Sequence, residues 1–155
     1  MSQVHLAIPA GRREGDLSRG SDNAVLVDDG LETVIAISLH TDIAATDDDG
    51  LPIEERRGYW ADTVEDDLVG GPIGSRLWLV ARNTLTPATL LQAQDAALEA
   101  VKWLVDEGAV GRFECEAVRS GTSANDARLA LYAYRPGETS PYYTYTWELH
   151  FALDQ

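Results

Sequence analysis

The chain has 155 residues, with 26 acidic against 12 basic side chains and a net charge of −14. This length predicts one domain that can bury a core, and the charge disfavours nucleic acid as a partner because the protein's field repels phosphates. The single cysteine excludes an intrachain disulfide and a cysteine-rich zinc site. No apolar run approaches the ~18 residues of a membrane span, so we expect a soluble protein made in a cytoplasm.

The first third of the chain predicts an arm followed by one short element. Residues 1–23 are rich in breakers and charges, as in "GRREGD". We therefore predict an N-terminal arm over 1–23, with a short strand at 4–8, and a single domain over 24–155. The segment "LETVIAISLHTD", residues 31–42, is ambiguous. Its β-branched residues suit a strand, yet its apolar residues also fit one face of a helix. The acidic stretch "ATDDDGLPIEE" is expected to be a loop.

A long helix is the clearest local prediction. Thr86 is placed to cap it, Pro87 suits the first helical position, and Gly108 suits the left-handed position just beyond its end. The helix would have about twenty residues and a length of roughly 30 Å. Its apolar residues recur at helical spacing. Those expected to face the core are Leu90, Leu91, Ala97, Leu98, Val101, Leu104 and Val105.

Three strands are predicted after the helix, in "GRFECEAVR", "ARLALYAYR" and "YYTYTWELHFAL". The last alternates most strictly, which is typical of a strand with one buried face. Short breaks between the three favour an antiparallel meander with the helix packed on its apolar side. The expected fold class is therefore α+β. The predicted buried face of the last strand consists of Tyr143, Tyr145, Trp147, Leu149, Phe151 and Leu153.

The sequence contains no recognisable motif for catalysis or metal binding. Aligning Gly50 with the sixth position of an EF-hand loop places Arg56 where a bidentate glutamate is needed. The three histidines form no ligand pair, and Ser75 lacks the nucleophile elbow. Cys115 alternates with apolar neighbours and reads as a core residue. With 26 acids in the chain, a glycosidase-like carboxylate pair has no specific support.

Two segments, "RRGYWAD" and "GPIGSRLWLV", combine arginine with tryptophan. These residue types anchor protein interfaces because they bury large areas and make directional contacts. The alternative is that the tryptophans belong to the core while the arginines bridge nearby acids. In that case the expected acids are Asp62, Glu65, Asp66 and Asp67.

In their order along the chain, these segments resemble the Mu-type tail baseplate family of contractile phages, over roughly residues 24–150. That family is similar to the T-even baseplate wedge protein that initiates the tail sheath, although "DEGAVGR" stands here in place of the Glu-Pro-Arg found after the helix in the T-even relatives. The resemblance implies a structural component at the wedge or sheath-initiation level, made in the cytoplasm of a bacterial host. Two signatures match the family, Arg56, Arg57, Gly58, Trp60 and Asp62, and then Gly74, Ser75, Arg76, Leu77 and Trp78.

The resemblance also implies partners and an interface. The partners would be other wedge or hub proteins and sheath subunits, contacted in part by addition of a strand to a sheet edge. No enzyme activity, cofactor, metal or small-molecule substrate is expected. Two alternatives stay open: a tail-associated cell-wall hydrolase similar to lysozyme, and a stand-alone acidic binding module. The residues expected to form the interface are Arg56, Arg57, Trp60, Asp62, Arg76 and Trp78.

Overall fold

The computed structural model of the chain describes residues 30–58, 73–121 and 123–153, together with the backbone of four two-residue strands nearer the N-terminus. The chain divides into two compact units, Met1–Ile37 and Ser38–Gln155. In the first unit, β1 (Gln3–Val4) pairs with β4 (Val27–Asp28), and β2 (Leu6–Ala7) pairs with β3 (Asp16–Leu17), both antiparallel. Most of the expected arm lies outside the described residues, and the domain boundary at 23/24 stays a prediction.

The helix–strand ambiguity of residues 31–42 is resolved as a helix, α1 (Leu31–His40), which runs across the division between the two units. Its hydrogen bonding begins where the Val34 amide donates to the Gly30 carbonyl at 3.0 Å. Burial along it follows positions i, i+3 and i+4, at Ile35, Ser38 and Leu39. This period belongs to a helix, whereas a strand would bury alternate residues.

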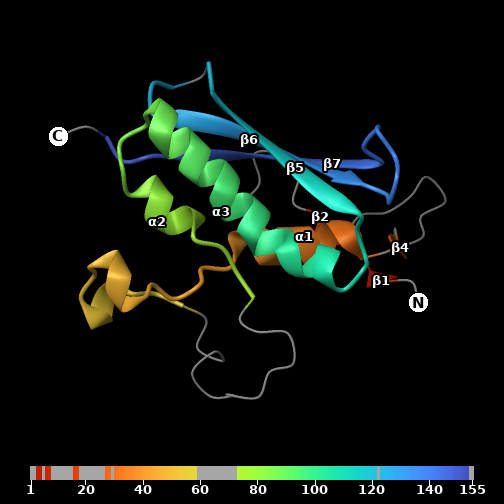
Figure 1. Cartoon of the computed structure of the whole chain (residues 1–155). Coiled ribbons are helices and arrows are strands. Elements are labelled where there is room, and N and C mark those ends of the chain that lie inside the picture. The colour runs from red at the N-terminus through yellow and green to blue at the C-terminus, as the bar shows by residue number, and fades with distance from the viewer. Residues whose placement is uncertain are drawn as a thin grey trace. The chain divides into compact units, whose positions relative to one another are not determined.

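The second unit is built on a three-stranded antiparallel sheet in the order β5-β6-β7, with β5 (Arg112–Arg119), β6 (Asp126–Tyr134) and β7 (Tyr143–His150). The long helix α3 (Pro87–Asp106) lies across one face of this sheet, against β5 and β6, and the short helix α2 (Leu77–Ala81) packs beside α3 (Figure 1). The α+β class and the predicted meander are confirmed. Two 3₁₀ turns, η1 (Asp47–Asp49) and η2 (Ile53–Glu55), shape the acidic loop.

The strand register explains why one face of the sheet is apolar. Cys115 lies opposite Leu131, which lies opposite Tyr145, and the next layer joins Ala117, Leu129 and Trp147 in the same way. Side chains opposite each other point to one face. Leu129 and Leu131 on the central strand are almost fully buried. The aromatic residues of β7 are only half-buried, and Leu153, which was expected to continue their face, is 72% exposed. That part of the prediction is wrong because β7 ends at His150.

The ends of α3 form as predicted, but its buried face is shifted. Thr86 accepts a hydrogen bond from the Thr89 amide at 3.2 Å, and Gly108 adopts a φ of +77°. Leu91 is 60% exposed, so its placement in the core was wrong. Alanine makes up much of the buried face of α3, and its small side chain lets neighbouring elements lie close to the helix. The buried alanines of α3 are Ala93, Ala96, Ala97 and Ala100.

Candidate functional site

The second signature begins with a turn that is tied to the segment following α1. The Ser75 amide donates to the Thr41 carbonyl at 2.8 Å, and the Ile43 amide donates to the Ser75 carbonyl at 3.1 Å. The Ser75 hydroxyl, which is buried, donates to the Leu39 carbonyl at 2.7 Å. Gly74 has a φ of +148°, and a Cβ there would stand 2.8 Å from the Thr41 carbonyl oxygen. The turn therefore requires glycine at 74 and fixes the start of α2.

Trp78, which follows this turn on α2, is buried within the chain, with 8% of its surface exposed. Its indole Nε1 donates to the Ile43 carbonyl at 2.9 Å, so the polar atom of the ring is satisfied. The guanidinium of Arg57 lies over the ring, 4.8 Å from its centre. Trp78 thus acts as a platform that joins α2 to the loop and positions an arginine from the first signature.

The arginines of both signatures, together with Arg82, pair with acids of the loop that runs from the end of α1 through η2. Arg57 reaches Asp42 at 2.9 Å, and Arg76 pairs with Asp49. Two further pairs, Arg56–Asp47 and Arg82–Glu55, complete the set. Each exposed pair contributes little to stability by itself, about 0–1 kcal/mol, but four pairs on one loop hold it in a single arrangement. We call these four pairs the arginine clamp.

The loop held by the clamp also has its own internal hydrogen bonds. The Thr46 amide donates to the Asp49 carboxylate at 2.7 Å. This bond, with further help from Arg76, holds the pKa of Asp49 below its ordinary value. The Arg56 Nε donates to the Leu51 carbonyl at 3.0 Å, which closes the loop. A preorganised loop of this kind loses little entropy when a partner binds it.

Within the first signature, the backbone at Arg57 and Gly58 has an unusual conformation and is closely packed. Arg57 has a φ of +49°, a left-handed conformation that is unusual for a residue with a side chain. Gly58, with a φ of +111°, approaches Ala44 so closely that a Cβ would lie 2.7 Å from the Ala44 Cβ. Arg57 keeps 57% of its side chain exposed. The backbone therefore presents Arg57 on the surface.

The structure brings together four of the six residues expected at the interface. Arg56, Arg57, Arg76 and Trp78 meet around the loop, with Trp78 buried and the arginines partly exposed. Trp60 and Asp62 lie outside the described residues, as do the acids that were the expected partners of the arginines in the alternative interpretation.

The acids that do pair with the arginines were missed by sequence reasoning. They lie 9 to 27 residues before their partners in the chain. The longest separation, 27 residues, occurs twice, between Asp49 and Arg76 and between Glu55 and Arg82. Only the acidic composition of the loop hinted at them. Pairing over such a separation depends on the tertiary contact between the loop and α2, which no local pattern encodes.

The histidines at 40 and 150 and the cysteine at 115 contact neighbouring parts of the fold. The Nε2 atom of His40 lies 3.0 Å from the Tyr145 hydroxyl, and burial lowers the pKa of this histidine. Burial raises the pKa of the Cys115 thiol to about 12. His150 pairs across the strands with Asp126 at 2.7 Å. Across the described ranges, no group of three His, Cys, Asp or Glu side chains could hold a metal ion. No helix described here has the length and apolar character needed to cross a membrane.

Comparison with known proteins identifies the family. The profile of the family described as phage protein GP46 matches residues 31–139, from the start of α1 through β6 and thus across both signatures. The baseplate protein gp46 of Escherichia phage Mu is 42% identical over 114 residues, which is 72% of this chain and 75% of the relative. The Mu-like prophage FluMu protein gp46 of Haemophilus influenzae is 40% identical over 103 residues, covering 66% of this chain and 67% of the relative.

The chain therefore belongs to the GP46 family of phage proteins, a Mu-type baseplate protein family. The resemblance noted in the sequence is confirmed. At the level that these relatives support, the protein is a structural component of a phage baseplate.

Proposed function

We propose that this protein acts at the wedge or sheath-initiation level of a contractile tail baseplate, after synthesis in the cytoplasm of the bacterial host. It works by assembly with other wedge or hub proteins and with sheath subunits, and it carries no catalytic activity. The observation that supports this most directly is the arginine clamp, in which three signature arginines and Arg82 hold the loop, and in which Arg57 is fixed against Trp78. Side chains arranged in this way present a surface to a neighbour.

Arg57 is the clamp residue best placed to touch such a neighbour. Its guanidinium stacks on Trp78 and pairs with Asp42, so its position is set before any partner arrives. More than half of its side chain remains exposed. An arginine that is already held in position makes forked hydrogen bonds to a carboxylate with little further loss of entropy. We propose that Arg57, with Arg56 and Arg76 beside it, forms the interface, and that Trp78 positions them from within.

The outer edge of β5 is the proposed site of strand addition. In the described part of the chain, β5 pairs along its full length with β6 alone. The Ser120 amide donates to the Asp126 carbonyl, so even-numbered residues of β5 face β6 and odd-numbered backbone groups point away from it. Just beyond the end of β7, the Ala152 amide donates to the Ala81 carbonyl, so the chain there already contacts α2. An incoming strand would therefore bond to the outward-facing backbone of Phe113, Cys115 and Ala117.

Electron microscopy of particles from a producing strain that lacks this gene tests the proposed level of action. We expect baseplates or tail tubes without sheath. Intact contractile particles that adsorb but fail to breach the wall would instead favour the hydrolase. Fully normal particles would contradict both the structural and the hydrolase role in the tail.

Complementation of the deletion strain tests the proposed interface. Arg57→Gln should leave the purified protein folded by circular dichroism but reduce particle yield at least about tenfold, as loss of one interface ion pair predicts. Arg128→Gln is the matched control, since Arg128 is similarly exposed at 62% but lies on the sheet. Equal yields from the two variants would contradict the role of Arg57.

Hydrogen exchange tests the strand addition. In the free protein, the inward amides of β5 should exchange slowly and the outward amides quickly. In assembled particles, mass spectrometry should show about half of the β5 amides gaining protection. No gain in the peptide covering β5 would exclude this edge as the template.

A further inference from the structure

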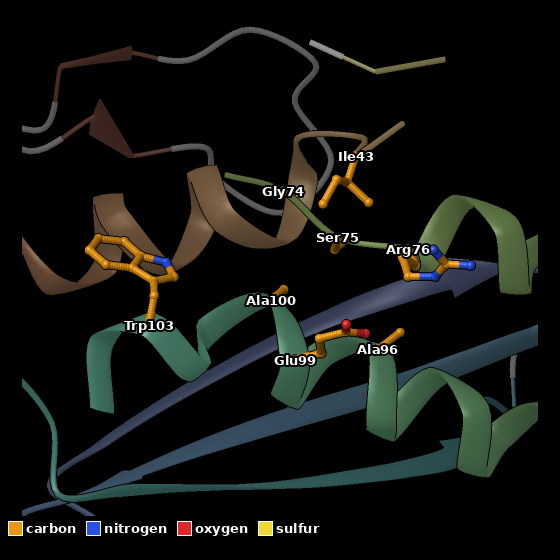
Figure 2. A pocket seen from close by; sticks show the side chains of 8 residues that line it. All are labelled: Ile43, Gly74, Ser75, Arg76, Ala96, Glu99, Ala100 and Trp103. Atoms are coloured by element: carbon orange, nitrogen blue, oxygen red, sulfur yellow. The ribbon is translucent and has the colours of Figure 1, made fainter. Parts of the chain in front are cut away.

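A pocket with a volume of about 160 Å³ opens between α3 and the turn that carries Ser75. Figure 2 shows its floor formed by α3 and its opposite wall formed by the turn and by Ile43. An engineered cavity of about 150 Å³ is large enough to hold benzene, so this pocket can accept the greater part of a side chain. The residues on α3 that line it are Ala96, Glu99, Ala100 and Trp103.

The lining on α3 follows positions i, i+3, i+4 and i+7, which form one stripe of a helix. The two alanines of this stripe are each 6% exposed and leave room where larger residues would fill the space. Glu99 lies between them with its carboxylate directed toward the turn, and Trp103 closes one end while Arg76 lies at the other (Figure 2). The pocket therefore combines an apolar floor, an aromatic ring and one carboxylate, with the guanidinium of Arg76 at the end away from Trp103.

Most polar side chains around the pocket already make a hydrogen bond or an ion pair within the chain. The indole nitrogen of Trp103 donates to the Ser38 hydroxyl at 3.1 Å, so this residue offers an occupant only its ring. The Ser75 hydroxyl donates to the Leu39 carbonyl, and Arg76 is paired with Asp49. Within the described ranges, the Glu99 side chain makes no hydrogen bond or ion pair. Glu99 is therefore the polar side chain of the pocket that remains available to a ligand.

We propose that this pocket receives a lysine or arginine side chain from a neighbouring baseplate subunit. The apolar stem of such a side chain would lie along Ala96, Ala100 and Ile43, as long cationic side chains do on apolar surfaces. Its charged head would pair with Glu99 and contact the ring of Trp103. The net charge of −14 adds a favourable field for a basic partner. The ligand chemistry rests on the pocket alone, whereas its source in a neighbouring subunit rests on the proposed function.

Nuclear magnetic resonance of the labelled, full-length protein tests the ligand chemistry. The probe is n-butylguanidinium chloride, with n-butanol as the neutral probe of similar length. We expect the guanidinium to shift the Trp103 indole resonance and the Ser75 and Ala100 amides, and the shifts to weaken at high salt. Equal shifts from n-butanol, or shifts confined to other parts of the chain, would overturn the assignment.

Two variants on the exposed side of α3 separate charge in the pocket from charge on the helix. Glu99→Gln should weaken guanidinium binding about tenfold, because it removes the charge and keeps the shape. Asp95→Asn, one turn earlier on the same helix and also exposed, should bind like the parent protein. Unchanged binding by Glu99→Gln would overturn the proposal.

Particle assembly then tests the source of the cation. In the deletion strain, Glu99→Lys should lower particle yield at least tenfold, while Asp95→Lys should restore normal yield. Guanidinium binding in the parent protein together with normal assembly of Glu99→Lys would overturn the neighbouring subunit as the source. A deletion strain that still makes normal particles would reject the proposed function, while the resonance shifts would still decide the chemistry of the pocket.

Discussion

Truncation of Trp78 should cost more stability than any exposed substitution nearby. The ring is 92% buried on the basis of its 8% exposure, its Nε1 bonds to the Ile43 carbonyl at 2.9 Å, and Arg57 stacks upon it. Replacing a buried tryptophan by alanine costs about 3–5 kcal/mol through lost burial and the cavity left behind. Trp78→Ala should therefore lower the free energy of unfolding by about 4 kcal/mol.

Trp78→Phe divides this loss into its parts. Phenylalanine keeps most of the apolar ring but leaves the Ile43 carbonyl without its donor, which costs about 1–3 kcal/mol. Because a domain of this size loses about 2–4 °C in Tm per kcal/mol, Trp78→Ala should melt about 8–16 °C below the parent.

Urea denaturation followed by circular dichroism provides the measurement, with an unchanged m-value as the sign that both variants unfold in the same way. Leu91→Ala is the control, since Leu91 is 60% exposed and should lose less than about 0.5 kcal/mol. If Trp78→Ala were no less stable than this control, Trp78 would not be the platform described above. If Trp78→Phe lost as much as Trp78→Ala, the hydrogen bond rather than the ring would carry the effect.

Three further predictions concern the backbone, the helix cap and the thiol. Gly74→Ala should cost about 1–3 kcal/mol because its Cβ would meet the Thr41 carbonyl, and more than Gly108→Ala, at about 1 kcal/mol, where the space is open; thermal melts that rank the two in reverse would contradict this. Thr86→Ala should cost about 1 kcal/mol through the lost cap while Thr86→Ser stays near neutral, which chemical denaturation can resolve. Since the thiolate is the nucleophile and the pKa of Cys115 is raised to about 12, its alkylation by iodoacetamide at pH 8 should be about a thousandfold slower than that of an ordinary thiol. Labelling at the rate of an exposed cysteine would contradict the raised pKa of the half-buried Cys115 thiol.

The parts of the fold that could be predicted from sequence depend on local signals. The cap at Thr86, the proline after it and the glycine at 108 define the ends of α3 within the chain itself. Alternation along β5, β6 and β7 likewise needs only neighbouring residues. For the same reason the resemblance to the baseplate family, which rests on the order of short segments, was confirmed.

The errors arise where burial depends on what lies opposite. Leu91 and Leu153 are apolar residues in the right period, yet both are exposed. The buried face of α3 consists largely of alanines at other positions, and β7 ends before 153. Period shows that a face exists, whereas only the packed neighbour decides how wide the buried part is. The choice of helix for 31–42 was left open by the sequence for a similar reason, since its residues suit both periods.

The features of the candidate site likewise divide into those set by the local sequence and those set by tertiary packing. The residue types of the signatures, and the absence of recognisable catalytic motifs, are properties of the sequence by itself. Tertiary structure decided that Trp78 is buried and supports Arg57, and that Arg76 pairs with Asp49, 27 residues earlier in the chain. The pocket beside Glu99 belongs to this second group as well. The local sequence pattern specifies which side chains are available at a surface. Ion pairs and cavities, in contrast, are formed by segments that are distant in the chain. They therefore exist only once the loop, α2 and α3 have packed together.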